Sequence, residues 1–430
     1  MSRLEKYPAY KDSGVEWLGE IPEGWELTKL GTKFIERKEK VSDKDYEPLS
    51  VTKNGVIPQL DSAAKSNDGD NRKLVKKGDF VINSRSDRKG SSGVSALDGS
   101  VSLIYIALEP LGINPIFCNY LLKSNGFIEE FYRNGHGIVA DLWTTRFWDM
   151  KSIMLGIPPK QEQIKIATFL DEKTKQLDKA IQQKEQLIEL LKERRQILIN
   201  DAVTKGLDKT VAMKDSGVEW IGEIPEGWEV KKLKYIIKHK LKYGANESGI
   251  EYQENLPRYV RITDFSNSGK LSEKNKFSLS WESGKDYLLK DGDILFARSG
   301  ATVGKTYQFK KSMSTEEFYS FAGYLIKAET NEQIILSDFL YLYTNSDLFE
   351  SWKEHIFNKA TIENIGADKY SELFITIPSI LEQKIILKQY NIDGAKLDKT
   401  INLQQQQITK LKEYKTTLID SVVTGKVRVS

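Results

Sequence analysis

The stretch "DSGVEWLGEIPEGWE", from Asp12 to Glu26, returns almost unchanged as "DSGVEWIGEIPEGWE", from Asp215 to Glu229. The copies lie 203 residues apart and differ only where Leu18 is replaced by Ile221. Each copy combines acidic side chains with two tryptophans, an isoleucine and a proline, which offer apolar area for packing. We therefore interpret this stretch, the Trp motif, as a structural clasp that leads into each half of a duplicated chain.

A second pair of similar segments follows at an offset of 220 residues, Ile157–Gly206 and Ile377–Lys426. Both start with an Ile-Pro-x-x-x-Glu-Gln joint and share Leu-Asp-Lys, Leu-Lys-Glu and Val-Thr matches. Each half thus consists of a Trp motif, a variable part, a joint and a long segment, a duplication that decides the fold before any local pattern does. The expected boundaries are 1–156, 157–206, 207–376 and 377–430.

The long segments carry a heptad pattern in which seven of ten seam positions are apolar, and the interruptions fall at the same three places in both. A seam of this length predicts coiled-coil pairing. About 40 residues of helix form a rod of roughly 60 Å. The expected seam consists of Leu170, Leu177, Ile181, Ile188, Leu191 and Leu198 in the first helix and of Leu397, Ile401, Ile408, Leu411 and Leu418 in the second.

One helix cannot bury such a seam alone, so the matching helix is the expected partner. Antiparallel pairing would place the variable parts at opposite ends of the rod, around an approximate two-fold axis, and parallel pairing would place both at one end. Alternatively, each helix packs onto its own domain or onto another protein. The matching interruptions favour mutual packing, although the same stripe could also dock partners, and the predicted arrangement is an antiparallel pair.

The variable parts, roughly Leu27–Gly156 and Val230–Thr376, are each long enough for a domain. "GDFVINSRS", from Gly78 to Ser86, and "GDILFARSG", from Gly292 to Gly300, both read as a Gly-Asp turn, a strand and an Arg-Ser pair, and they align after a slip of one residue. Later strands and an amphipathic helix follow in the same order. We predict an α/β (α+β) protein whose two mixed domains share a fold but differ in exposed residues.

Sequence patterns for catalysis and metal binding are missing. His136, His239 and His355 have no partner at metal-ligand spacing, and the single cysteine, Cys118, excludes an intrachain disulfide. "SGATVGKT", from Ser299 to Thr306, approaches a phosphate-binding loop, but Ser299 stands where a glycine is required and no strong apolar helix follows. A Gly-rich turn between strands is the stronger interpretation.

Composition fits a soluble protein of several domains, with 39% hydrophobic and 29% charged residues. No apolar run is long enough to span a membrane, and the N-terminus lacks a signal-peptide core, so a cytoplasmic protein is expected. The net charge of +3 does not by itself indicate nucleic-acid binding. Basic runs at Arg72–Lys89 and Lys231–Lys242 could neutralise phosphates, although for either run taken alone an ordinary solvated surface is the better explanation.

Several of these features resemble a known family. The "KDSGVEWLGEIPEGWE" opening, the "IPPKQEQ" and "IPSILEQ" joints, the Leu-Asp-Lys helices and the "AVTKG" and "VVTGK" endings are similar to those of the specificity subunit of type I restriction-modification systems. The resemblance covers both halves of the chain, and the variable parts match only in outline.

The resemblance implies a non-catalytic subunit that binds double-stranded DNA. Each variable part would be a target recognition domain for one half of a split sequence, and the helix pair would set the gap between the halves. Two modification subunits would dock on the helical regions, and two restriction subunits would join through them. S-adenosylmethionine for adenine N6 methylation, together with ATP and Mg, would belong to those partners, and this chain would need no cofactor or metal.

Candidate DNA contacts lie on the strand-to-loop turns of the variable parts. Arginine commonly reads guanine in the major groove, whereas other basic contacts only position the phosphates. Two further hypotheses stay open: a scaffold whose coiled coil tethers two protein-binding domains, and a nucleotide-hydrolysing enzyme that uses Ser299–Thr306. The candidate DNA-binding residues are Arg85, Arg88, Lys89, Arg298 and Lys305.

Overall fold

A computed structural model describes residues 5–61, 69–137, 143–266, 269–300, 302–357 and 364–429. The chain divides into two compact units. Unit 1 combines Met1–Glu185 with Gln404–Ser430, and unit 2 is Gln186–Leu403. Each long helix therefore contributes one part to unit 1 and the other part to unit 2.

Unit 1 is built around a four-stranded antiparallel sheet of order β10-β9-β12-β4, next to a three-stranded sheet of order β11-β8-β5 and the pairs β1-β2, β3-β13 and β6-β7. The aromatic side chains of α2 and α3 share one core with β9 and β12. The elements are β1 (Tyr10–Asp12), β2 (Glu20–Pro22), β3 (Glu26–Lys29), α1 (Leu30–Lys33), β4 (Phe34–Glu36), β5 (Lys40–Val41), β6 (Leu49–Thr52), β7 (Gly55–Pro58), β8 (Arg72–Val75), β9 (Phe80–Asn83), η1 (Ser86–Arg88), β10 (Ser92–Val94), β11 (Gly99–Val101), β12 (Tyr105–Pro110), α2 (Pro115–Leu122), α3 (Asn125–Arg133), α4 (Phe147–Met150) and β13 (Met154–Ile157).

Unit 2 contains a four-stranded sheet of order β17-β24-β21-β22, a second sheet of order β18-β20-β19-β23 and the pairs β14-β15 and β16-β25. The elements are β14 (Met213–Asp215), β15 (Glu223–Pro225), β16 (Glu229–Lys232), η3 (Leu233–Tyr235), β17 (Lys242–Tyr243), β18 (Ile250–Glu251), β19 (Arg258–Val260), η4 (Ile262–Asp264), β20 (Phe277–Ser278), α6 (Trp281–Gly284), η5 (Lys285–Tyr287), β21 (Ile294–Ala297), β22 (Thr306–Gln308), η6 (Lys311–Met313), β23 (Tyr319–Phe321), β24 (Leu325–Ala328), α7 (Ser337–Tyr343), α8 (Asp347–Phe357), α9 (Ala367–Ser371) and β25 (Phe374–Ile377).

The main sheets of the two units have the same topology. The order β10-β9-β12-β4 in unit 1 corresponds strand by strand to β22-β21-β24-β17 in unit 2, and α2-α3-α4-β13 corresponds to α7-α8-α9-β25. The second sheets differ, because that of unit 2 includes the parallel pair β19 with β23, whereas the strand pairs β11–β8 and β5–β8 of unit 1 are antiparallel. The prediction that the variable parts share a mixed α/β fold is confirmed, and the duplication extends through the parts with little sequence similarity.

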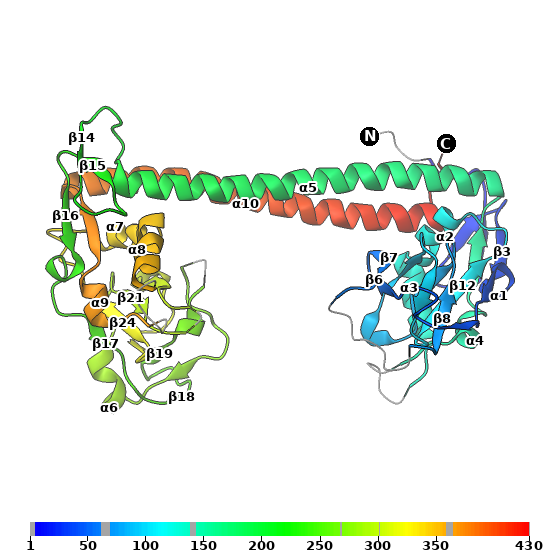
Figure 1. Cartoon of the computed structure of the whole chain (residues 1–430), viewed down its shortest axis with the longest axis horizontal. Helices are drawn as coiled ribbons and strands as arrows, with labels where there is room; N and C mark the ends of the chain where they lie inside the picture. The colour runs from blue at the N-terminus through cyan, green and yellow to red at the C-terminus, as the bar shows by residue number, and fades with distance from the viewer. Residues whose placement is uncertain are drawn as a thin grey trace. The chain divides into compact units, whose positions relative to one another are not determined.

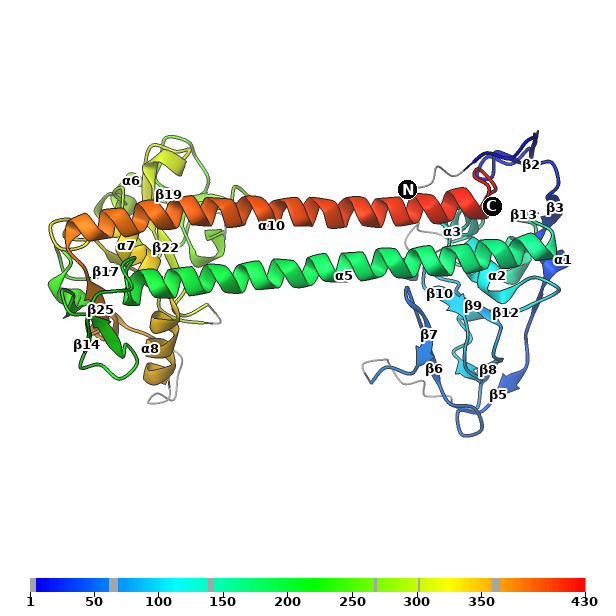
Figure 2. The ribbon, with the colours of Figure 1, turned by 90° about the horizontal axis from the view of Figure 1, so that it is seen from above.

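The long helices α5 (Lys160–Thr204) and α10 (Ile380–Val423) pair antiparallel within each unit. In unit 1, Asp178 lies 2.7 Å from Lys415, and in unit 2, Arg195 lies 2.6 Å from Asp398. Residue numbers thus rise along α5 while they fall along α10, and the two ribbons run side by side (Figures 1 and 2). The antiparallel prediction is confirmed, and parallel pairing is excluded.

None of the predicted seam residues is exposed. Leu170, Leu177, Ile181, Ile188, Ile408 and Leu418 are buried, and Leu191, Leu198, Leu397, Ile401 and Leu411 are half-buried. The polar interruptions also face the seam. Lys184 donates a 3.0 Å hydrogen bond to Gln404, its equivalent 220 residues later. The Arg195–Asp398 and Asp178–Lys415 ion pairs are likewise equivalent under this offset. Polar side chains of this kind fix the register of a helix pair at some cost in stability.

The Trp motif packs against the joint of its own half. In unit 1, Trp25 is buried and its Nε1–H donates to Glu162, 3.3 Å away, and β3 pairs with β13. In unit 2, buried Trp228 donates to Glu382 at 3.0 Å, and β16 pairs with β25. The glutamate of each Glu-Gln joint thus anchors a tryptophan, and these contacts support the interpretation of the motif as a clasp.

The glutamine of each joint is buried and satisfies backbone groups. Gln163 donates to the carbonyl of Pro158 at 2.9 Å and accepts the N–H of Asn114 at 2.8 Å. Gln383 makes the equivalent bonds with Pro378 and Leu336 at the same distances. Because each amide joins the start of a long helix to the helix of the adjacent domain, the joint fixes the domain on the rod.

The end of the opposite helix completes each clasp. Gly206, beyond α5, has a φ of +66° and lies so close to Trp228 that a Cβ would be 3.1 Å from its ring. Gly425, beyond α10, has a φ of +75°, and a Cβ there would be 2.3 Å from Pro22. The left-handed backbone and the close approach both require glycine. The repeated endings are therefore glycine caps that seat each helix on the Trp motif.

Unit 2 also contains a buried charged network around Arg258. Arg258 on β19 is 1% exposed and pairs with Glu316, which is 3% exposed, and with Glu273, which is 55% exposed. Burial alone would raise the pKa of Glu316, but hydrogen bonds from Lys276 and Thr315, among others, lower this pKa to about 2. The carboxylate is therefore retained in a site that would otherwise favour its neutral form.

Replacing Glu316 by glutamine is expected to destabilise the protein by about 3 kcal/mol near pH 7, because the buried Arg258 would lose its charged partner. The pKa of Glu316 is lower in the folded than in the unfolded protein, so its contribution is complete above the ordinary glutamate pKa and is lost as the pH falls toward 2. Thermal unfolding of wild type and Glu316→Gln between pH 7 and pH 3 should show the difference shrinking. The exposed Glu273→Gln change should cost less than about 1 kcal/mol, and equal effects of the two changes would contradict the assignment.

Candidate nucleic-acid interface

The central strand of each main sheet starts from the same turn. Gly78 and Gly292 have φ values of +98° and +88°, and the aspartate that follows each is almost fully buried. Asp79 accepts the N–H of Lys76 at 2.8 Å and pairs with Arg37, whereas Asp293 accepts the N–H of Lys290 at 2.8 Å and pairs with Lys327. Because the start of the strand is fixed in this way, the residues that follow its last position lie at the corresponding edge of the main sheet in each unit.

The register of these strands separates the two candidate arginines. Phe80 and Ile294 are the first residues of β9 and β21, so Ser84 is the structural equivalent of Arg298, and Arg85 is the equivalent of Ser299. Isolated bridges agree, since Arg85 pairs with Thr144 and Ser299 with Asn364. Successive residues of an extended chain point to opposite sides. The shift of one residue that aligns the two Arg-Ser pairs in the sequence is therefore also present in the structure. Arg85 and Arg298 do not occupy equivalent positions.

In unit 1 the turn after β9 presents three exposed basic side chains, Arg85, Arg88 and Lys89. Lys89 pairs with Glu129 at 2.6 Å, and Arg88 lies 3.8 Å from Asp87. A cavity of about 350 Å³ opens beside Lys89, with Tyr132 and Trp143 among its lining residues. The structure thus brings the three predicted residues together on one exposed turn, next to aromatic side chains.

In unit 2 the candidate residues are less exposed. Arg298 is half-buried, with its guanidinium 5.1 Å from the ring centre of Tyr243. Lys305, also half-buried, donates to the carbonyl of Phe265 at 3.3 Å. The sequence did not single out Tyr243 or the exposed Tyr324, whose carbonyl accepts the Arg298 N–H at 3.0 Å. Their position follows from the neighbouring strands β17 and β24, a pairing that the short strands did not reveal.

The "SGATVGKT" stretch is a hairpin connection and not a phosphate-binding loop. It joins β21 to β22, which pair antiparallel through Ile294 with Gln308 and Phe296 with Thr306. A phosphate-binding loop must instead lead from a strand into a helix. The strand that follows contradicts the nucleotide-hydrolysing hypothesis and agrees with the interpretation as a turn.

The described residues include no group of three or more His, Cys, Asp or Glu side chains that could hold a metal ion. His136 lies 3.4 Å from Asp149, and His355 stacks against Trp220 with ring centres 5.1 Å apart. Cys118 is fully buried, and burial raises the pKa of its thiol. The described helices also include none that is both long and apolar enough to cross a membrane.

Several side chains of the two basic runs form hydrogen bonds or ion pairs within the protein. In the first, Arg72 is buried against Ser100, and Lys73 pairs with Glu36 at 3.1 Å. In the second, Lys232 and Lys234 share Glu372, and Lys238 pairs with Glu329 at 3.2 Å. Several of the basic side chains counted in the sequence are therefore buried or paired with acids, and the exposed turn after β9 remains the clearest basic surface of the first run.

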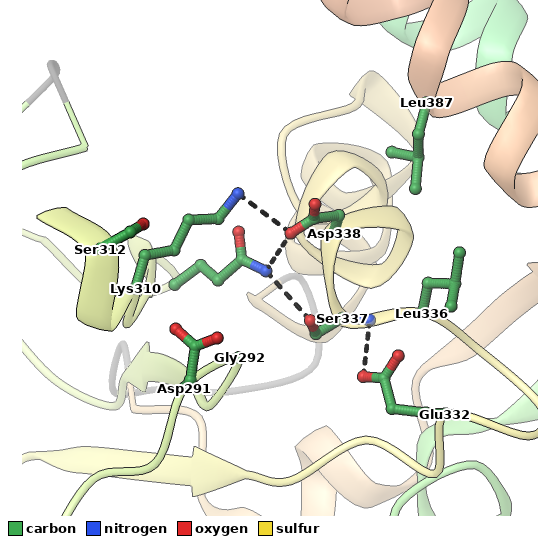
Figure 3. Close-up of a pocket in the computed structure, with 10 residues that line it drawn as sticks. Asp291, Gly292, Lys310, Ser312, Glu332, Leu336, Ser337, Asp338 and Leu387 are labelled. Atoms are coloured by element: carbon green, nitrogen blue, oxygen red, sulfur yellow. Dashed lines mark hydrogen bonds and ion pairs between the residues drawn. The ribbon is translucent and has the colours of Figure 1, made fainter.

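Unit 2 also contains a cavity of about 360 Å³ beside Asp291 and Gly292, at the start of β21 (Figure 3). Lys310 and Gln308 both contact Asp338, at 3.1 and 2.7 Å, and Glu332 accepts the N–H of Ser337. Because this cavity adjoins the start of β21 and Arg298 follows its end, the cavity lies outside the candidate interface.

Residues 225–413 match the family model of the type I restriction modification DNA specificity domain. The matched part begins at Pro225, inside the second Trp motif, and runs through the Arg298 turn into α10, so it includes Trp228, the joint, the main sheet and the candidate interface of unit 2. The resemblance to type I restriction-modification specificity subunits that was drawn from the sequence is confirmed by this match and by the relatives that follow.

Individual relatives span almost the whole chain. The chain is 24% identical to the specificity subunit of the type I restriction enzyme MjaVIII of Methanocaldococcus jannaschii, over 95% of this chain and 94% of that protein, and 24% identical to the StySPI specificity subunit of Salmonella potsdam, over 86% and 82%. A chain from a solved type I R-M system superposes with a TM-score of 0.71 at 15% identity, covering 94% of this chain and 98% of that one. The HsdS subunit of Thermoanaerobacter tengcongensis gives 0.55 at 16% identity, covering 95% and 98%. These structural similarities show a shared fold.

Proposed function

We propose that this chain chooses the DNA site of a type I restriction-modification complex by reading the two halves of a split sequence with two domains. Residues 1–156 and 207–376 are the proposed target recognition domains, and the long helices at 157–206 and 377–430 set the gap between the half-sites. Arg85, Arg88 and Lys89 would contact one half-site, and Arg298 and Lys305 the other.

One observation carries this proposal: the same sheet is built twice with different basic residues at the same edge. The common clasp, joint and Gly-Asp turn fix the scaffold, whereas the register places Arg298 at the position of Ser84, and Arg85 at the position of Ser299. A scaffold that only tethers two protein-binding domains would not require a common framework with different basic residues at the same edge. Two domains with one framework and different donors are suited to two different short sequences, because specificity in the major groove comes from the pattern of side-chain donors and acceptors.

Catalysis is assigned to partner subunits. Within the described residues the only motif that approached an enzyme site is a hairpin connection, and no cluster is suited to a metal. Large apolar side chains remain exposed on the rod, among them Leu190 at 61% and Leu381 at 70%. We assign such exposed apolar positions on the helices to two modification subunits, which would bring S-adenosylmethionine and would also recruit two restriction subunits that use ATP and Mg. Removal of nucleotide or metal should leave site choice by this chain unchanged.

Exchanging residues 27–156 for the equivalent part of a relative should change one half of the recognised sequence and leave the other half intact. The exchange replaces most of the paired strands β3 and β13 together and leaves the Trp motif through Glu26 and the joint from Ile157 in place, so the donor domain meets the same clasp. The readout is sequencing of methylated adenines produced by the complex with its modification partner. Exchange of residues 230–376 is the matched control and should change the other half. Altered specificity in both halves after one exchange would contradict the modular assignment.

A further inference from the structure

We propose that Arg298 reads a guanine in the half-site bound by unit 2, and that Tyr243 holds the arginine in its reading position. This inference rests on the proposed function and names the base that one side chain selects. It gives Arg298 a different role from the other basic candidates, which would contact phosphates or other bases.

The backbone of Arg298 is fixed on both sides. It follows the last residue of β21, donates its N–H to the Tyr324 carbonyl at 3.0 Å and accepts the N–H of Ile365 at 2.9 Å. The side chain is fixed as well, because the guanidinium lies over the ring of Tyr243, 5.1 Å from its centre. The Tyr243 hydroxyl in turn accepts the N–H of Ala367 at 2.9 Å, which holds the ring. The side chain is thus oriented before any ligand arrives, and this reduces the entropy lost on binding.

The guanidinium of Arg298 has no acidic partner in the described part of the chain, and this sets it apart from nearby arginines of unit 2. Arg258 pairs with Glu273 and Glu316, and Arg261 pairs with Asp264. Tyr243 and Tyr324, which both contact Arg298, are 40% and 51% exposed, so the arginine lies at an open surface. A charged group kept at the surface without an acid is available for an acceptor outside the chain.

The chemistry of that acceptor follows from the planar guanidinium. Its N–H donors lie in one plane, and the O6 and N7 atoms of guanine accept two of them side by side. A phosphate also accepts two donors from an arginine, but a contact that only positions the DNA backbone does not need the guanidinium plane to be fixed, as the Tyr243 ring fixes that of Arg298. Ser84 occupies the equivalent place in unit 1 and is 7% exposed, so unit 1 has no matching reader. A guanine contact at this position is therefore expected only in the half-site of unit 2.

The test uses the full chain in complex with its modification partner and a set of duplexes in which each pair of the wild-type target is replaced in turn. Arg298→Ala should reduce discrimination at one guanine of one half-site by roughly 10- to 100-fold, the loss of about 1–3 kcal/mol expected for a bidentate contact. Arg298→Lys should keep overall affinity but lose the same discrimination. Lys305→Ala should weaken binding to all duplexes about equally.

Tyr243 supplies a second, independent test. Tyr243→Phe keeps the ring and should retain discrimination at that guanine, whereas Tyr243→Ala should relax it partly while thermal unfolding stays close to wild type. A uniform loss of affinity in Arg298→Ala and Arg298→Lys, relaxation at an A·T pair, or a half-site without guanine would overturn the inference. A wild-type complex that binds all duplexes equally would instead overturn the proposed function.

Discussion

Replacing Trp228 by alanine is expected to lower the free energy of unfolding of unit 2 by roughly 3–5 kcal/mol, the range for a buried tryptophan. Trp228 is 1% exposed and donates to Glu382, and it also contacts Phe339 and Gly206. Its removal would leave a cavity where β16, the joint and the end of α5 meet. Differential scanning calorimetry of the full chain should show a clear fall in the unfolding temperature.

Phenylalanine substitutions separate the hydrogen bond from the packing. Glu162 in unit 1 accepts from Tyr7 as well as from Trp25, whereas the described contacts of Glu382 in unit 2 include only one side-chain donor, Trp228. Trp228→Phe should therefore cost about 1.5–3 kcal/mol, the range for a bond to a charged group, and Trp25→Phe clearly less. Equal losses would show that the Tyr7 hydrogen bond does not compensate at Glu162, and losses near zero in both variants would show that the Trp–Glu bond contributes little to the clasp.

Duplication made most of the architecture predictable. The Trp motif and the joint each occur twice in the sequence, so two halves and a helix pair could be inferred before any strand was assigned. The same offset of 220 residues relates the paired side chains of the rod, as in Arg195–Asp398 and Asp178–Lys415. The interruptions at Lys184 and Gln404 were visible in the sequence, but their mutual contact became evident only from the register.

Contacts between distant residues were the part that the sequence did not reveal. Counting charges in Arg72–Lys89 could not show that Arg72 is buried against Ser100 or that Lys73 meets Glu36. Aligning the two Arg-Ser pairs placed both arginines on one turn, although a slip of one residue moves a side chain to the other side of a strand. The pairing of β17 with β24, which brings Tyr243 to Arg298, depends on tertiary structure that two-residue strands do not encode locally.

Removing one heptad from each long helix is expected to shorten the gap between the two recognised half-sites by about three base pairs. Seven residues of helix correspond to about 10 Å, and base pairs are spaced at about 3.4 Å. Deleting residues 181–187 together with 401–407 leaves Asp178, Arg195, Asp398 and Lys415 in place. Both ion pairs can therefore re-form with the seam in its original heptad phase.

A single deletion is the matched control. Removing only residues 181–187 brings Asp178 and Arg195 closer on α5 while the spacing of Asp398 and Lys415 on α10 is unchanged, so at most one of the two ion pairs can be kept. The half of the rod that loses its pair also loses seam register, and site choice should fail although the domains stay folded. Methylation-site sequencing distinguishes the outcomes for the double deletion. The same two half-sites at a shorter distance are expected, and an active variant that kept the original gap would show that the helices do not set it.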